Sequence, residues 1–250
     1  MTSSPAINPA ALTDKTILVT GASSGIGKEI ALLCASLGAK VCAVGRNSFR
    51  LNQTVEALDG TGHQAHICDL TSQSDLQTLV DNLPQLHGVV HCAGIGSRVI
   101  CKNIEQSDID AVFTVNTFAP MLLQSALLRE KKITKSASIV FIASMAPDKP
   151  TAGNAIYSAS KAAIIAYAKV LAVELAQRLI RVNCVSPAMI WTDLITADGI
   201  DEYTLKEDQN NYLLKRYGQP ADVANLVAYL LSDVSSWMTG ENIHITGGLK

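Results

Sequence analysis

Three residues in the second half of the chain have the types and the spacing needed to exchange a proton with a carbonyl or alcohol oxygen. Ser144 comes thirteen positions before Tyr157, and Lys161 follows Tyr157 by four. A free tyrosine, with a pKa of about 10, holds its proton too tightly for ready exchange near neutrality. The Lys161 ammonium would favour the phenolate and lower the pKa of Tyr157, which could then act as acid or base. Ser144 could donate a hydrogen bond to an oxygen that gains charge.

Each of these residues also has an ordinary structural role. A serine at the end of a strand is usually a turn residue, a helical tyrosine usually packs half-buried, and a lysine usually faces solvent. Tyr157 and Lys161 lie four apart in a helical pattern and therefore share one helix face. Whether Ser144 meets them depends on the elements that carry all three.

Short runs rich in strand-forming residues alternate with longer helical patterns along the chain. The runs expected to be strands are 16–20, 40–45, 63–70, 88–94, 137–144, 180–187 and 242–246. They are nearly continuous in apolar residues, which favours a parallel sheet covered by helices on both faces. Right-handed crossovers then give an α/β fold with a doubly wound, seven-stranded parallel sheet of Rossmann-like type.

Residues 1–250 are expected to form one domain, since 48% of the residues are hydrophobic and can fill one sizeable core. The longest helices are expected at 105–130 and 155–178, and residues 1–14 are expected to form an N-terminal tail. Residues 188–216 interrupt the alternation and are longer than a usual connection, which is typical of a lid or binding loop. We call them the substrate segment. The alternative is an excursion without function.

A glycine-rich turn, TGASSGIG at residues 20–27, follows the first expected strand and opens a helix. Gly21 lets the chain leave the strand tightly, and the missing Cβ atoms of Gly25 and Gly27 allow backbone to approach a pyrophosphate. The helix N-terminus adds free N–H groups and a positive dipole end. A turn without a ligand is the alternative. The expected contacts to a dinucleotide here are Gly21, Ser23, Ser24, Gly25, Ile26 and Gly27.

The end of the second expected strand predicts which dinucleotide binds. An acidic residue there would hold the ribose 2′-hydroxyl and repel a 2′-phosphate. This chain has Gly45 at that place, followed by Arg46, whose guanidinium pairs well with a phosphate. We therefore expect NADP(H) to be preferred over NAD(H), with a solvated surface arginine as the alternative. Arg50 is a weaker candidate for the same task.

Further contacts to the dinucleotide are expected after the third and fourth strands. Asp69, followed by Leu70, is placed to accept a hydrogen bond from the adenine amino group, although a turn or helix-cap role fits it equally well. Ala93 and Gly94 are small enough for the chain to approach the cofactor closely, and a plain turn is again the alternative.

Composition excludes several other classes of protein. The formal net charge of −2 gives no basic excess for nucleic acid, and no uninterrupted apolar run approaches a membrane span of roughly 18 residues. The N-terminus lacks the pattern of a secretory signal. Six scattered cysteines without a C-x-x-C pair indicate reduced thiols in a cytoplasmic protein, and neither cysteines nor histidines show metal-ligand spacing.

The motifs together resemble the short-chain dehydrogenase/reductase family, in its single-domain branch that includes 3-oxoacyl-ACP reductase-like members. The resemblance runs from about Lys15 to Gly248 and keeps the family's order of motifs, and Pro187 follows the sixth strand as the family pattern requires. The set that carries it is TGASSGIG, HCAG, Asn116, Ser144 and Tyr157-x-x-x-Lys161.

This resemblance implies an activity and roles for single residues. It implies a carbonyl reductase, reversible as an alcohol dehydrogenase, in which Ser144 polarises the carbonyl and Tyr157 with Lys161 handles the proton. Asn116 would help to hold a water that relays protons to Lys161. Pro187 would turn the chain after the sixth strand. The Ile190 backbone would meet the cofactor carboxamide, and Thr192 would bond the carboxamide or the phosphates. The resemblance also implies a homotetramer or homodimer.

Departures from the family pattern and competing functions stay open at this point. His91-Cys92 replaces the usual Asn-Asn, and Ala188 and Thr246 replace a usual Gly and Asp. A nucleotide-sugar epimerase or dehydratase shares Tyr-x-x-x-Lys, and a non-catalytic NADP-binding sensor or scaffold subunit is the alternative from another class. A thioester, sugar, steroid or small ketone substrate is equally open. Ile195, Tyr203 and Leu205 are candidates for an apolar pocket wall.

Overall fold

The computed structural model describes residues 10–196 and 202–249. Its sheet has seven strands in the order β3-β2-β1-β4-β5-β6-β7, and every neighbouring pair is parallel. The predicted fold class is confirmed. The strands are β1 (Thr16–Thr20), β2 (Lys40–Gly45), β3 (Gln64–Ile67), β4 (Leu86–His91), β5 (Ile133–Ile142), β6 (Arg181–Pro187) and β7 (Asn242–Ile245).

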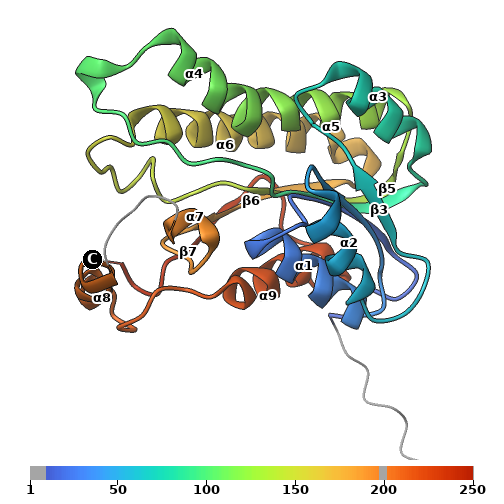
Figure 1. The fold of residues 1–250 in the computed structure, drawn as a ribbon. Coiled ribbons are helices and arrows are strands. Elements are labelled where there is room, and N and C mark those ends of the chain that lie inside the picture. The colour runs from blue at the N-terminus through green and yellow to red at the C-terminus, as the bar shows by residue number, and fades with distance from the viewer. Residues whose placement is uncertain (1–9, 197–201, 250) are drawn as a thin grey trace, which may run out of the picture.

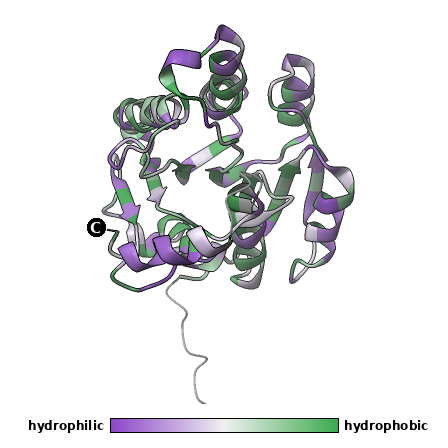
Figure 2. Ribbon diagram, turned by 60° about the vertical axis from the view of Figure 1, so that its left-hand side comes forward, coloured by the Kyte–Doolittle hydropathy of each residue, from purple (hydrophilic) through white to green (hydrophobic). Residues whose placement is uncertain are grey.

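Helices cover both faces of this sheet (Figure 1). One face carries α1 (Gly25–Ser36), α2 (Ser48–Glu56) and α9 (Pro220–Leu231), and the other carries α3 (Gln73–Asn82), α4 (Gln106–Phe113), α5 (Ala119–Arg129) and α6 (Ala155–Leu175). Short 3-10 turns are η1 (Cys101–Asn103), η3 (Ala176–Arg178) and η5 (Asp233–Ser235). Figure 2 shows the hydrophobic residues along the strands and on parts of the helices, where two buried clusters lie, one on each face.

Three strand ends differ from the sequence expectation by a few residues. β5 starts at Ile133 and ends at Ile142, so Ser144 lies two residues beyond the strand. β3 ends at Ile67, two residues before Asp69, and β4 ends at His91, before Ala93. Because all strands are parallel, these three polar or small turns meet at the same carboxyl edge of the sheet.

The helix expected at 105–130 is divided by a wider turn. α4 ends at Phe113, a π-helical turn η2 (Thr114–Phe118) follows, and α5 begins at Ala119. Asn116 lies inside this turn and is only 2% exposed. Single π turns within a helix are frequently found at functional sites. The sequence pattern of residues 105–130 does not reveal the turn, because apolar positions continue through it.

Two helical stretches are apolar over a length that the search for uninterrupted apolar runs did not detect. Residues Gln106–Arg129 and Ala155–Arg178 are long and apolar enough to cross a membrane by length and composition alone. Half of the first apolar window and 39% of the second are buried inside the molecule, where they pack on the sheet. A helix in the core of a globular protein has the same properties. The expectation that no membrane is involved stays a prediction.

The substrate segment contains structure of its own, namely α7 (Asp193–Thr196), α8 (Glu202–Asp208) and η4 (Gln209–Asn211). Ile195 and Leu205 are 6% and 5% exposed and pack with Tyr212 and Tyr217 in a small separate cluster. Tyr203 is 73% exposed. The expectation that these three line an apolar pocket wall is therefore wrong for this arrangement, because two are enclosed within the segment and the third faces solvent.

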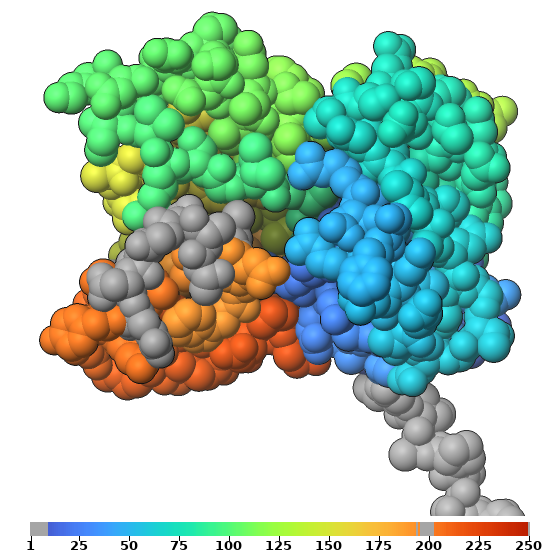
Figure 3. All heavy atoms as spheres, in the orientation of Figure 1, coloured from blue at the N-terminus to red at the C-terminus, as the bar shows by residue number. Residues whose placement is uncertain are grey.

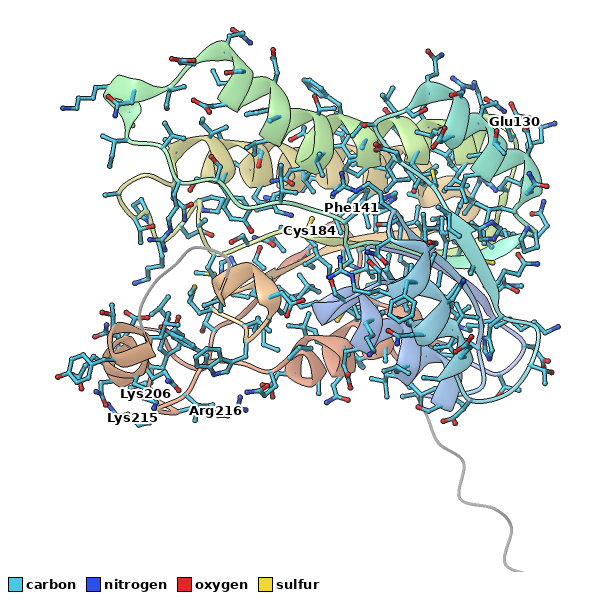
Figure 4. The ribbon with its side chains drawn as sticks, in the orientation of Figure 1. Glu130, Phe141, Cys184, Lys206, Lys215 and Arg216 are labelled. Atoms are coloured by element: carbon cyan, nitrogen blue, oxygen red, sulfur yellow. The ribbon has the colours of Figure 1, made fainter. Side chains whose placement is uncertain are left out.

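Both ends of the substrate segment are held by backbone pairing. Near its start, Trp191 N–H donates to the carbonyl of Gly218 and Gly218 N–H donates to that of Met189. Near its end, Leu213 and Leu214 N–H donate to the carbonyls of Gly248 and Gly247 at the C-terminus. Figure 4 shows Lys206, Lys215 and Arg216 together at the outer side of this part of the molecule, away from the sheet.

Candidate active site

The glycine turn between β1 and α1 brings two backbone segments into contact. Gly21 has φ +70, and a Cβ built on it would lie 3.0 Å from the Cα and the N of Ala93, beyond β4. A Cβ on Gly27 would lie 2.3 Å from the Gly21 carbonyl oxygen. Thr20 joins the same two segments, since its hydroxyl accepts hydrogen bonds from the N–H groups of Cys92 and Ala93 after β4 at 3.0 and 3.2 Å. Only glycine permits this packing.

The N-terminus of α1 is suited to an anion. Among the described residues the N-cap Ser24 makes no side-chain cap hydrogen bond, and no acidic residue stands in the first turn. Thr192 lies directly over this turn, because a Cβ on Gly25 would be 3.2 Å from its methyl group. Figure 3 shows the molecular surface hollowed between the blue, green and orange parts of the chain on this side. A pyrophosphate fits the free N–H groups of the turn.

The end of β2 carries the residues expected to meet the adenosine ribose. Gly45 is buried, and a Cβ on it would lie 3.3 Å from the side chain of Ser23. Arg46 is exposed and makes no hydrogen bond or ion pair with any residue that the structure describes. Asp69 accepts hydrogen bonds from Thr71 N–H and hydroxyl at 3.0 and 2.8 Å, so it holds a turn here. These bonds lower the pKa of Asp69, and the charge of Arg46 adds to that lowering.

The other residues expected at the cofactor lie around the same edge. Ile190 and Pro187 are buried at the end of β6, and Ile190 packs into the core on the α1 face. Ile26 is partly buried on that face, and Leu70 is partly buried on the opposite one. The side chains of Ile26, Leu70 and Ile190 therefore pack against the two clusters that cover the sheet, and only that of Ile190 is fully buried.

The Lys161 ammonium is buried at the carboxyl end of β5. Its side chain is 6% exposed, and Nζ donates to the Ile142 carbonyl at 2.9 Å. Nζ lies 5.8 Å from the centroid of the Tyr157 ring. A Cβ on Gly94 would be only 3.4 Å from Nζ, so glycine at that position leaves the ammonium accessible from the cleft side. Lys161 Nζ thus lies near both the Tyr157 ring and Gly94.

Ser144 is joined to the start of α6 through one residue. Ala146 N–H donates to the Ser144 hydroxyl at 3.1 Å, and the Ala146 carbonyl accepts from the Ser158 hydroxyl at 3.1 Å. Met145 N–H donates to the carbonyl of Pro187, which ties this turn to β6. The turn after β5 therefore places Ser144 beside the helix turn that carries Tyr157. The hydrogen bond by which Ser158 ties α6 to this turn could not be predicted from the sequence.

Asn116 occupies a position between the turn after β4 and α6. Its side-chain oxygen accepts from Ile95 N–H at 2.8 Å, and its amide donates to the Ile95 carbonyl at 2.9 Å and to the Ser160 hydroxyl at 3.2 Å. A Cβ on Gly94 would lie 3.2 Å from the Asn116 oxygen. Asn116 therefore fixes the segment that carries Ala93 and Gly94 against the helix that carries Tyr157 and Lys161.

Cysteine and metal chemistry find no support in the described part of the chain. All six cysteines are free thiols, and burial raises the pKa of Cys34 to about 12 and that of Cys184 to about 12. No group of three or more His, Cys, Asp or Glu side chains that could hold a metal ion occurs among the described residues.

A glycine turn at the carboxyl edge of a doubly wound parallel sheet is typical of dinucleotide-binding proteins, and here Gly21 of the turn adjoins Ala93 while Gly94 adjoins the buried Lys161. The family model described as Enoyl-(Acyl carrier protein) reductase matches residues 21–250. The chain is 35% identical over 238 residues to a 3-oxoacyl-[acyl-carrier-protein] reductase of Rickettsia felis, covering 95% of this chain and 98% of that one. It is 36% identical to an L-xylulose reductase of Caenorhabditis elegans, covering 95% and 96%.

Solved structures agree with these relatives. A short-chain type dehydrogenase/reductase from Mycobacterium ulcerans has a TM-score of 0.86 at 32% identity, covering 96% of this chain and 90% of that one. A 7α-hydroxysteroid dehydrogenase complexed with NADH and 7-oxo glycochenodeoxycholic acid has a TM-score of 0.88 at 28% identity, covering 96% of both chains. The chain belongs to the short-chain dehydrogenase/reductase family.

His91, one of the departures from the family pattern, braces the end of β4. It is 5% exposed, its Nε2 lies 3.0 Å from Gln124 Oε1, and its ring stacks on Phe141 at 4.5 Å between centroids. Figure 4 shows Phe141 near the middle of the sheet. The His91 Nδ1 and the Gln124 amide nitrogen have no hydrogen-bond partner among the described residues. Burial lowers the pKa of His91 to about 4.

This buried histidine predicts that stability falls in mild acid. The unfolded chain titrates His91 at about 6.5. The stability that neutral His91 contributes is complete above that value and is lost as the pH falls toward about 4, because only the unfolded state gains the proton in that window. The free energy of unfolding, measured with urea at pH 7 and pH 4.5, should decrease between these two values by on the order of 2–3 kcal/mol because of His91. In His91→Asn this part of the decrease should be absent. Equal pH dependence in both proteins would contradict this.

Proposed function

We propose that this protein is an NADP(H)-dependent oxidoreductase that reduces a carbonyl to a secondary alcohol, reversibly. The observation that carries the proposal is the buried Lys161 ammonium, which is held by the Ile142 carbonyl, lies 5.8 Å from the Tyr157 ring and adjoins Gly94 at the cofactor side. Burying a charged group costs free energy, and such groups are concentrated at functional sites, where their charge acts on a neighbouring residue or ligand.

The residues present fit a nicotinamide dinucleotide at this edge. The free N–H groups of the Gly21–Gly27 turn would hold the pyrophosphate, and the turn at Ala93 and Gly94 leaves room for the ribose. The bound nicotinamide supplies the hydride. An ammonium has three N–H donors, of which the Ile142 carbonyl takes one. The other two are left for the nicotinamide ribose and for the proton path to Tyr157.

The chain's own groups then manage charge on the substrate oxygen. Tyr157 donates its proton to the oxygen during reduction and takes it back during oxidation. Ser144 donates a hydrogen bond to the same oxygen and stabilises the charge that develops there. Lys161 places a positive charge 5.8 Å from the centroid of the Tyr157 ring. Asn116 holds the Ile95 segment in place and supports a water that returns protons to Lys161.

The substrate class follows less directly from the relatives. Their names span an acyl-carrier-protein thioester, a ketose and an oxo bile acid, which share a ketone and little else. A panel holding a 3-oxoacyl thioester, ketosugars, steroids and small diketones therefore fits the proposal, with NADPH oxidation followed by absorbance.

Replacing the proton donor tests the reaction. Tyr157→Phe should lower kcat with any substrate found in the panel by about 100-fold or more, because the phenol is lost and the ring is kept. NADPH affinity, measured by fluorescence, should change by less than about two-fold. Tyr203→Phe, at an exposed tyrosine of α8, is the control and should keep full activity. Equal turnover by Tyr157→Phe and the unaltered protein would rule out this role of Tyr157.

The preference for the 2′-phosphate rests on the end of β2. Gly45 offers no carboxylate to repel a phosphate, and Arg46 is exposed beside it with its guanidinium available. The N-terminus of α2, which begins at Ser48, lies on the same side and adds a positive dipole end. A structure of the same fold is complexed with NADH, so the fold alone does not select NADP(H) and these local residues carry the argument.

Arg46→Ala should weaken NADPH binding by about ten-fold or more and leave NADH binding within about two-fold, because charge-assisted hydrogen bonds to the phosphate are lost. Titration of cofactor fluorescence measures both affinities. Lys40→Ala removes an equal charge at the opposite end of β2 and should change neither. The assignment fails if the unaltered protein binds NADH as tightly as NADPH.

We further propose that the chain assembles as a homodimer or homotetramer through α5 and α6. Leu122, Val170 and Val173 are 60%, 58% and 77% exposed on these two helices. Val170 also lines a groove between these helices, together with Arg129 and Glu174, side chains of opposite charge. In a two-fold pairing of identical faces, each arginine can meet the partner's glutamate.

The free thiols also support a reducing, cytoplasmic setting.

Val173→Glu should convert the assembly to monomers, because it places a charge in the centre of an apolar contact. Size-exclusion chromatography with light scattering measures the mass. Tyr203→Glu introduces the same charge at a site of similar exposure, 73%, and should leave the mass unchanged. Elution of the unaltered chain as a monomer would overturn the proposal.

A further inference from the structure

Ser160 lies between Tyr157 and Lys161 on α6 and has no part in the chemistry proposed above. It is fully buried, at 0% exposure, in a helix that is otherwise rich in alanine and other apolar residues. A hydroxyl in such a place must be hydrogen-bonded, since an unpaired one would be costly. Its partners therefore indicate what the hydroxyl is for.

Among the described residues, three hydrogen bonds that involve a side chain meet at Ser160. Its hydroxyl donates to the Tyr157 carbonyl at 2.7 Å and accepts from the Asn116 amide at 3.2 Å. Its carbonyl accepts from the Thr117 hydroxyl at 3.2 Å. Both Asn116 and Thr117 belong to the π-helical turn η2. Among the described residues, both side-chain hydrogen bonds from this turn to α6 end at Ser160.

The same Asn116 side chain also makes two hydrogen bonds to Ile95 in the turn after β4, one through its oxygen and one through its amide nitrogen. The hydroxyl of Ser160 is therefore the point at which the cofactor-side turn, the π turn and the helix with Tyr157 and Lys161 are joined. Thr117 holds the same helix and has no bond to the Ile95 turn among the described residues.

We propose that Ser160 is a positioning residue, whose hydroxyl sets the rotation of the first turns of α6 against Asn116 and thereby the placement of Tyr157 and Lys161. This rests on the proposed function. Without the hydroxyl, the Asn116 side chain still has its two hydrogen bonds to Ile95. The Thr117 hydroxyl still donates to the carbonyl of residue 160 in α6, so the fold persists. The link between Asn116 and the Tyr157 turn is lost. Displacements of about 1 Å at a catalytic group reduce rates by on the order of 100-fold.

Ser160→Ala tests the proposal without an identified substrate. Alanine is a better helix former than serine, so the helix is kept. With NADP⁺ bound, the tyrosinate absorbance of Ser160→Ala minus that of Ser160→Ala/Tyr157→Phe isolates the titration of Tyr157. We expect this absorbance step about half a pH unit or more above that of the parent pair, because Lys161 then favours the phenolate less. NADPH affinity should stay within about two-fold.

Thr117→Val is the matched control, because it removes a hydrogen bond to the same residue from the same turn and leaves the hydroxyl link intact. Its absorbance step should not move. Ser160→Cys, which keeps the volume and a weak donor, should give a smaller shift of the same sign and serves if the alanine variant does not fold. With any active substrate, kcat should fall about ten-fold or more in Ser160→Ala, with an unchanged KM for NADPH.

Two failures can be told apart. If the absorbance step is the same in Ser160→Ala, Thr117→Val and the parent, the positioning role is overturned and the proposed function stands. If the parent and Tyr157→Phe titrate alike and turn substrate over equally, Tyr157 is not the proton donor, and both proposals are overturned together.

Discussion

The hydrogen bond from the buried Lys161 ammonium to the Ile142 carbonyl connects the chemistry of this protein to its sheet. Burying an ammonium costs several kcal/mol, which only well-placed acceptors offset. Ile142 ends β5, and its place is fixed by pairing on both sides, where Phe141 lies opposite His91 of β4 and Cys184 of β6. A change of register in either pairing would remove the acceptor. The central strands therefore have to form correctly before the site can exist.

The cofactor side depends on close approach of backbone. Gly21 touches the Ala93 backbone, Gly27 touches the Gly21 carbonyl, and the Thr20 hydroxyl fastens the turn after β4. Each contact excludes a Cβ, so side-chain size decides the site as much as side-chain chemistry does. The two halves meet at Gly94, which adjoins both Lys161 and Asn116. A side chain at this position would crowd both the ammonium and the asparagine oxygen.

Much of this arrangement could be predicted from the sequence, because strand order in a parallel sheet brings strand ends to one edge. Apolar runs located the strands, and the glycine spacing located the phosphate turn. Sequence could not show the π turn, since apolar periodicity continues from α4 into α5. It also could not show Ser160 or Ala146 as links, because a small residue in a helix or turn carries no pattern of its own. Tertiary contacts alone give these residues their roles.

The enclosed cluster in the substrate segment bears on how relatives with one reaction centre take different ketones. Ile195 and Leu205 pack with Tyr212 and Tyr217 instead of facing the cleft, and backbone pairs hold the segment at Gly218 and Gly248. The described part of the segment therefore has a small core of its own in addition to these two attachments. Thr192, near the start of the segment, lies over Gly25 of the turn between β1 and α1. The short stretch of chain after β6 thus adjoins the glycine turn and leads into the substrate segment.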